Sequence, residues 1–128
     1  MTDAPPHHIA AILPCSDLDA STAFYEQLGL SVVGDHGSYR LLADGKGWQL
    51  HLTNEAPEGW LIPGQNPFGL YLYTDRVAEL AERMRDIILE REKAPTHKPW
   101  GMYEFVLSDP DQTLIRVGWP SRLVSPPK

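Results

Sequence analysis

The sequence predicts an α+β protein built from two β-α-β-β-β modules. In each half, a short apolar run precedes a polar residue that can cap a helix and then apolar residues at helical spacing. Further short apolar runs, separated by turn signals, complete each half. Residues 54–66 carry two prolines, two glycines and no periodicity. We therefore expect one domain with modules at 7–53 and 67–118, joined by this connector, whose curved mixed sheets form a cleft.

The first module is expected to begin with a strand and a helix. The apolar run at 8–14 has the length of a strand, and Pro14 ends it. Ser16 or Asp17 can accept a hydrogen bond from the free N–H groups of the first helical turn, and Gly29 fits the left-handed residue that ends a helix. The apolar positions between these signals recur every four residues: Ala20, Phe24 and Leu28.

Three more strands follow in the first module, at 30–33, 39–43 and 48–53. Turn signals separate them: residues 34–37 (GDHG) and 44–47 (DGKG). The first module therefore has the order β-α-β-β-β.

The second module repeats this order. Residues 68–73 form an apolar, aromatic strand, and Asp75 is placed to cap the helix after it. Residues 94–99 contain prolines and allow only a short strand. The helix itself is predicted from a buried stripe of six apolar residues: Val77, Leu80, Ala81, Met84, Ile87 and Ile88.

A β-hairpin at 100–118 ends the second module. The polar turn at 109–112 (DPDQ) separates two arms rich in aromatic and branched residues. Because side chains alternate along a strand, Arg116 lies on the face opposite the apolar one. Arg116 can bind an anion or, as we prefer, pair with Glu104 on the neighbouring strand. The expected apolar face consists of Tyr103, Phe105, Leu107, Thr113, Ile115 and Val117.

Composition restricts the class of protein. Hydrophobic residues make up 42% and charged residues 22% of the chain, and no apolar run approaches the roughly 18 residues of a membrane span. The N-terminal residues lack a basic and then apolar signal sequence, so we expect a cytoplasmic protein. The net charge of −6 argues against nucleic acid as a partner and favours a cationic small molecule. Cys15 has no catalytic motif beside it, and no phosphate loop or serine elbow is present.

Several motifs carry a family resemblance. They are residues 12–29 (ILPCSDLDASTAFYEQLG), 50–52 (LHL), 98–105 (KPWGMYEF) and 108–111 (SDPD). In this order and spacing the chain resembles the glyoxalase/bleomycin-resistance/extradiol-dioxygenase superfamily, also called vicinal oxygen chelate proteins, and most of all its bleomycin-resistance branch. The resemblance covers nearly the whole chain and implies paired β-α-β-β-β modules. The chain departs from the family at Gln112, where glycine is usual because it tolerates a positive φ.

The resemblance also locates a potential metal site. Enzymes of the superfamily hold a divalent metal with His, Gln or Glu side chains from the first and last strands of each module. The matching positions here are Ala10, His51, Pro67 and Arg116, of which only His51 is a donor. Because an arginine cation repels a metal ion, we predict no metal, no other cofactor and no catalytic residue. His8 joins His51 in a metal site only if the strand register is shifted.

Six residues are the candidates for binding a ligand. Flat aromatic faces bind planar or cationic molecules over a large area, and Trp60 and Trp100 lie outside any core stripe. Each candidate also has a structural alternative: the aromatic residues can pack, and His51 can be a hydrogen-bonded core residue. The complete set is His51, Trp60, Tyr71, Trp100, Met102 and Arg116.

The leading functional prediction is a metal-free binding protein of the bleomycin-resistance type. As the resemblance implies, it forms a homodimer with ligand grooves between subunits and confers antibiotic resistance by sequestering a drug-like, bleomycin-like molecule. A cationic glycopeptide suits its acidic charge. The rival prediction is a metal-dependent glyoxalase-like lyase or dioxygenase-like enzyme that uses His8 and His51. A third is a domain with a vestigial cleft that binds other proteins.

Overall fold

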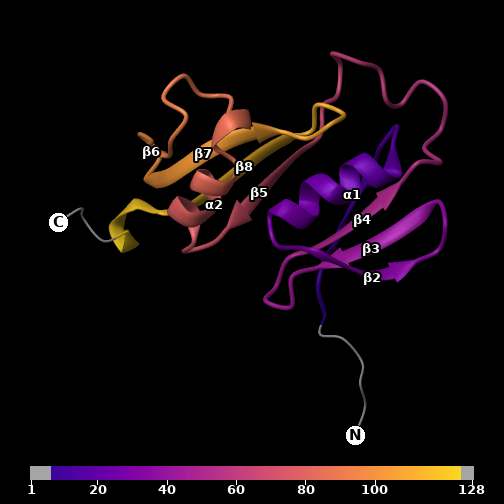
Figure 1. The fold of residues 1–128 in the computed structure, drawn as a ribbon, viewed down its shortest axis with the longest axis horizontal. Helices are drawn as coiled ribbons and strands as arrows, with labels where there is room; N and C mark the ends of the chain where they lie inside the picture. Colours follow the sequence, from indigo (N-terminus) through magenta and orange to yellow (C-terminus); the bar gives the residue numbers. More distant parts are fainter. Residues whose placement is uncertain (1–6, 125–128) are drawn as a thin grey trace, which may run out of the picture. The chain divides into compact units, whose positions relative to one another are not determined.

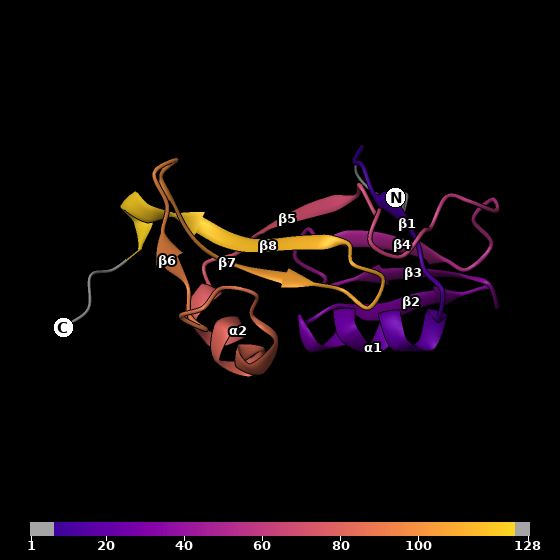
Figure 2. The ribbon, with the colours of Figure 1, turned by 90° about the horizontal axis from the view of Figure 1, so that it is seen from above.

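The computed structural model describes residues 7–124, and its chain divides into two compact units, Met1–Trp60 and Leu61–Lys128. Each unit contains a four-stranded mixed sheet with one α-helix on one face (Figures 1 and 2). The α+β class and the β-α-β-β-β order of both modules are thereby confirmed. Within the described residues, every helix is too short or too polar to cross a lipid bilayer.

The first unit has the strand order β1-β4-β3-β2. Strand β1 runs parallel to β4, whereas β4, β3 and β2 pair antiparallel, as expected for a meander after the helix. Leu50 and Leu52 of β4 are buried, and His51 between them points to the opposite face. The elements are β1 (Ala11–Pro14), α1 (Leu18–Gln27), β2 (Ser31–Asp35), β3 (Tyr39–Ala43) and β4 (Gln49–Thr53).

The predicted first strand at 8–14 is too long at its beginning. Strand β4 starts at Gln49, directly after a turn in which Gly47 has φ +134°, and Ala11 pairs with Leu50. In this register β4 offers no strand partner to residues 8 and 9, and regular pairing of β1 starts at Ala11. Apolar composition alone could not locate that start.

The start and end of α1 follow the predicted signals. The Asp17 carboxylate accepts a hydrogen bond from Ala20 N at 3.0 Å, and Gly29 adopts φ +108° after the helix. The buried side of α1 includes Phe24 and Tyr25, whose rings meet edge to face with centroids 5.0 Å apart. Burial of both rings holds this side of the helix against the sheet.

Asp17→Ala is expected to lower the free energy of unfolding by about 1 kcal/mol, because it leaves an N–H group of the first turn without its acceptor. Urea denaturation followed by circular dichroism measures this loss. Asp17→Asn keeps an acceptor oxygen and is expected to stay close to the wild type. Equal losses in the two variants would assign the effect to charge instead of capping.

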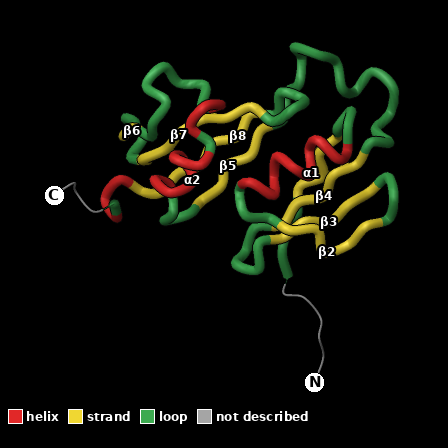
Figure 3. Tube along the Cα trace, in the orientation of Figure 1, coloured by secondary structure: helices red, strands yellow, loops and turns green. Residues whose placement is uncertain are grey.

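The second unit has the strand order β5-β8-β7-β6, with β5 parallel to β8 and the other pairs antiparallel. Residues 54–66 contain no helix or strand and belong to the long loop between β4 and β5 (Figure 3). The elements are β5 (Gly69–Tyr73), α2 (Val77–Arg83), β6 (Thr96–His97), β7 (Met102–Ser108) and β8 (Leu114–Pro120), with 3₁₀ turns at Arg85–Ile87 and Ser121–Leu123.

The hairpin of β7 and β8 has the predicted faces. Phe105 pairs with Val117 and Leu107 with Ile115, and all four are fully buried. In the turn, Gln112 has φ +69°, the conformation for which glycine is usual. Its side-chain oxygen accepts a hydrogen bond from Gly64 N at 2.6 Å, a bond that glycine could not make.

Two details of the second helix differ from the prediction. Asp75 is not the N-cap: Arg76 occupies that position without a side-chain capping bond, and Thr74 Oγ1 accepts from Arg76 N instead. The predicted stripe also loses Ile87, which is 44% exposed. The α-helix ends at Arg83 and tightens into a 3₁₀ turn, whose three residues per turn change the direction of later side chains.

Candidate ligand-binding site

A buried carboxylate, Glu104, lies at the centre of the candidate site. Along β7, Phe105 and Leu107 point to the α2 side, so Glu104 points to the opposite face of the sheet. Its exposed fraction is 0%, which is rare for a glutamate unless its charge is compensated. The side chain therefore needs strong partners.

Three of the six predicted ligand-binding residues supply these partners. Glu104 Oε1 accepts hydrogen bonds from Tyr71 Oη at 2.9 Å and from Trp100 Nε1 at 2.9 Å. Glu104 Oε2 accepts one from Arg116 Nη1 at 2.7 Å, which is also an ion pair. The preferred prediction for Arg116, a pair with Glu104, is confirmed. We call Tyr71, Trp100, Glu104 and Arg116 the Glu104 cluster.

The register of the sheet explains why these residues meet. Tyr71 of β5 lies beside Arg116 of β8, and Glu104 of β7 lies beside Gly118 of β8. A Cβ atom at Gly118 would lie only 2.2 Å from Tyr71 Oη and 2.8 Å from Glu104 Cβ. The phenol thus crosses β8 through the space that the missing side chain leaves.

Sequence reasoning missed Gly118 as part of the site and treated Glu104 only as a partner of Arg116. A glycine inside a strand often marks the close approach of another group, so Gly118 was the available signal. For Glu104, the alternation of β7 predicts the face but not the two additional donors. Those come from β5 and from the loop before β7, which only the folded sheet brings together.

Opposing effects act on the ionisation of Glu104. Desolvation by burial raises its pKa, but hydrogen bonds from Trp100, Arg116 and Tyr71, together with the charge of Arg116, outweigh burial and leave the pKa below its ordinary value. The carboxylate is therefore ionised at neutral pH. The contribution of ionised Glu104 to the stability of the fold is fully present above the ordinary glutamate pKa of about 4.3. It is lost as the pH falls through the lowered pKa of the folded state.

The pKa of Tyr71 is strongly raised, first by burial and then by its hydrogen bond to the Glu104 carboxylate. The neutral phenol is therefore favoured in the fold, and this stabilisation persists below the ordinary tyrosine pKa of about 10. It is lost as the pH rises through the folded-state pKa.

We expect an alkaline ultraviolet titration to show a late-ionising tyrosine that Tyr71→Phe removes. The difference between wild-type and variant titrations isolates this residue among the five tyrosines. A Tyr71 component that ionises together with the exposed tyrosines would contradict the hydrogen bond to Glu104.

An aromatic and a cationic group lie together at the exposed side of the cluster. The Arg116 guanidinium carbon lies 5.7 Å from the centroid of the Trp100 ring, a cation–π contact. Trp100 is 59% exposed, and the Arg116 side chain is 35% exposed. The indole therefore offers surface to solvent while its N–H group is bound to Glu104.

The other three predicted residues do not join the cluster. Met102 is half-buried and shares a face of β7 with Glu104, two positions away, but makes no hydrogen bond to it. His51 and Trp60 belong to the first unit. His51 Nδ1 lies 2.7 Å from Tyr39 Oη, and Trp60 is 61% exposed in the connector. The His51 ring therefore makes the kind of hydrogen bond that its structural alternative expects.

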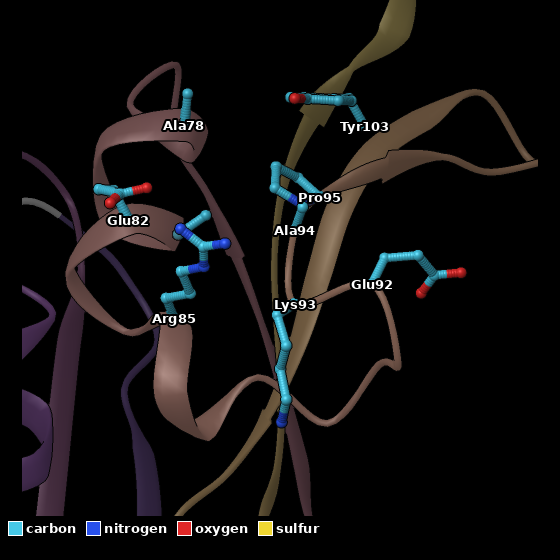
Figure 4. Close-up of a pocket in the computed structure, with 9 residues that line it drawn as sticks. Ala78, Glu82, Arg85, Glu92, Lys93, Ala94, Pro95 and Tyr103 are labelled. Carbon is cyan, nitrogen blue, oxygen red and sulfur yellow. The ribbon is translucent and has the colours of Figure 1, made fainter.

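Two cavities in the second unit lie on the α2 side of the sheet. One, of about 330 Å³, has Ala78, Glu82 and Arg85 on one wall and Ala94, Pro95 and Tyr103 opposite (Figure 4). The other, of about 410 Å³, shares Ala78 and Tyr103 with it and includes Trp119. Because Tyr103 alternates with Glu104 along β7, these cavities and the Glu104 cluster lie on opposite faces.

The four positions of the potential metal site do not supply a metal-binding set. His51 pairs with Ile12 in the observed register, and His8 lies before the start of β1 at Ala11. The shifted register that the rival prediction required is therefore not found. Among residues 7–124, no group of three or more His, Cys, Asp or Glu side chains is arranged to hold a metal ion.

Comparison with known proteins identifies the family. The sequence model of the Glyoxalase/Bleomycin resistance protein/Dioxygenase superfamily matches residues 6–117. The chain belongs to this superfamily. A bleomycin resistance protein from Klebsiella pneumoniae is 32% identical over 112 residues, which cover 82% of this chain and 86% of that protein. The predicted superfamily is confirmed, and so is the predicted likeness to bleomycin resistance proteins.

Solved structures agree with this membership of the superfamily. A bleomycin-binding protein in complex with bleomycin matches with a TM-score of 0.72 and 29% identity, over 88% of this chain and 97% of that one. Lactoylglutathione lyase from Agrobacterium tumefaciens matches with a TM-score of 0.66 and 25% identity, over 93% and 98%. Both a binding protein and an enzyme therefore share this fold.

Proposed function

We propose that this protein binds a bleomycin-like molecule and sequesters it without transforming it, which makes it an antibiotic-resistance protein. The observation that carries the proposal is the likeness to a protein that binds bleomycin, at 29% identity over 88% of this chain. The Klebsiella pneumoniae resistance protein, at 32% identity, supports the same role. In this proposal Trp100 and Arg116 contact the ligand, with Met102 beside them.

Charge supports a cationic ligand. The chain carries 17 acidic and 11 basic side chains, so its overall field attracts cations. Within the candidate site, the Glu104 carboxylate compensates the Arg116 guanidinium at 2.7 Å. A cationic ligand near Trp100 therefore meets a neutral pair instead of an isolated positive charge.

The proposal includes several further features. The two modules form one domain, the protein is a cytoplasmic homodimer, and the ligand lies in grooves between subunits to which His51 and Trp60 contribute. No metal takes part in this proposal. Only His51 among the four potential ligand positions offers a donor, and its Nδ1 is already engaged with Tyr39. Sedimentation velocity tests the dimer independently of ligand binding.

Calorimetric titration of the purified protein with metal-free bleomycin tests the proposed function. Saturable binding with a micromolar or lower dissociation constant, and unchanged bleomycin recovered afterwards, is the expected result. The absence of binding heat at several temperatures, with no change in melting temperature on adding bleomycin, would reject it.

The second candidate function is a metal-dependent lyase, favoured by the match to lactoylglutathione lyase at 25% identity. Metal analysis of protein purified without chelators separates the two functions. Stoichiometric metal together with lactoylglutathione lyase activity would support the enzyme. Bleomycin binding by protein that contains substoichiometric metal supports sequestration.

A further inference from the structure

We propose that Glu104 is the positioning residue of the ligand site: it fixes the Trp100 indole and the Arg116 guanidinium in one arrangement before a ligand binds. The inference rests on the proposed function for the identity of the ligand. The arrangement itself is a property of the unliganded protein and can be tested without one.

The two carboxylate oxygens divide this task. Oε1 accepts from the Trp100 indole at 2.9 Å and from the Tyr71 phenol at 2.9 Å, whereas Oε2 accepts from Arg116 at 2.7 Å. The bond to Oε1 restrains the indole at one edge, and the bond to Oε2 brings the guanidinium over the same ring at 5.7 Å. One buried group thus orients both exposed groups.

The burial of Glu104 makes this restraint strong. Its exposed fraction is 0%, so water does not compete for its lone pairs, and its hydrogen bonds to charged or polar donors keep their full strength. Trp100 is 59% exposed, so packing covers less than half of its surface. A binding site that is already ordered avoids the cost of immobilising side chains on association.

In this proposal Tyr71 acts on the site from behind Glu104. Its hydroxyl donates to Glu104 through the space above Gly118, so the phenol braces the carboxylate and is not itself directed at a ligand. Tyr71 and Gly118 therefore act on the site through Glu104. They are positioning residues as well, one step further from the ligand.

Glu104→Gln tests the inference, because an amide keeps the size of the side chain. If the remaining oxygen stays on Trp100 and Tyr71, the NH₂ group faces Arg116 and two donors oppose each other. We expect the near-ultraviolet circular dichroism of Trp100 to weaken in the unliganded variant, as identified by comparison with Trp100→Phe. We also expect bleomycin affinity to fall by about tenfold or more, the effect of losing one charge-assisted hydrogen bond.

Glu90→Gln is the matched control in the same unit. Glu90 also pairs with a cation, Lys98, and also accepts a second hydrogen bond, from Val106 N at 3.0 Å. Its side chain is 17% exposed, and it makes no bond to Trp100. This variant is expected to lose stability but to keep the Trp100 signal and to bind bleomycin within about twofold of the wild type.

The outcomes separate the inference from the proposed function. If wild-type protein binds bleomycin and Glu104→Gln binds equally well with an unchanged Trp100 signal, the inference is overturned. If the wild type does not bind, the proposed function fails, and the Trp100 signal alone decides the positioning role. Should Glu104→Gln not fold, Glu104→Asp keeps the charge but withdraws the carboxylate, and the same loss of Trp100 signal is expected.

Discussion

Arg116→Ala is expected to lower the free energy of unfolding by about 3 kcal/mol. The substitution removes the cation that compensates a fully buried carboxylate, and an unpaired buried charge is strongly destabilising. The value lies at the low end of the range for such pairs because Arg116 is 35% exposed and Tyr71 and Trp100 still donate to Glu104. Urea denaturation at neutral pH measures the loss.

Arg76→Ala is the control for this prediction. Arg76 forms an ion pair with Glu79 at 2.7 Å in the same unit, but the two side chains are 39% and 57% exposed. Exposed pairs contribute about 0–1 kcal/mol, so the stability of this variant is expected to change little.

The double variant Arg116→Met with Glu104→Gln should recover part of the stability lost in Arg116→Ala. Similar losses of unfolding free energy in Arg116→Ala and Arg76→Ala would mean that the buried ion pair stabilises the fold no more than the exposed one.

Gly118→Ala is expected to cost about 3 kcal/mol, because the new Cβ would lie 2.2 Å from Tyr71 Oη and 2.8 Å from Glu104 Cβ. The first contact displaces the phenol and breaks its hydrogen bond, and the second presses on the backbone of β7. Thermal and urea denaturation measure the cost, and a loss of near-ultraviolet signal from Trp100 should accompany it.

Gly69→Ala is the matched control for Gly118→Ala. Gly69 lies in β5 of the same sheet, and its added Cβ would approach Leu114 O at an ordinary 3.5 Å. The expected change is therefore within about 0.5 kcal/mol. Tyr71→Phe removes the atom that clashes most closely with the new Cβ. The loss of unfolding free energy caused by Tyr71→Phe should therefore be smaller in the Gly118→Ala background than in the wild type. Identical costs in both backgrounds would contradict the proposed crossing of the phenol over Gly118.

The sequence predicted those parts of the fold that local pattern determines. Strict alternation predicted the buried face of the 100–118 hairpin, and the cap at Asp17 with the stop at Gly29 predicted α1. Two boundaries were wrong for tertiary reasons: β1 begins where β4 offers a pairing partner, and α2 begins after Arg76 instead of Asp75. A short apolar run does not reveal which strand will pair with it, nor at which residue the neighbouring helix begins.

The candidate site was predicted in part. Aromatic character and strand phase selected Tyr71, Trp100 and Arg116, which the structure brings together at Glu104. The depth of Glu104 and the need for glycine at position 118 could not be predicted, since both depend on the lateral order β5-β8-β7 of the sheet. Strand order is a long-range property that the pattern of one segment does not contain.

The most direct test of the proposed ligand site is a bleomycin titration that follows tryptophan fluorescence in Trp100→Phe and Trp119→Phe. Trp119 is the control because it lines the cavity on the α2 side, away from the Glu104 cluster. We predict that most of the fluorescence change and most of the affinity are lost in Trp100→Phe and retained in Trp119→Phe. Undiminished affinity and an unchanged response in Trp100→Phe would contradict a ligand site at the Glu104 cluster.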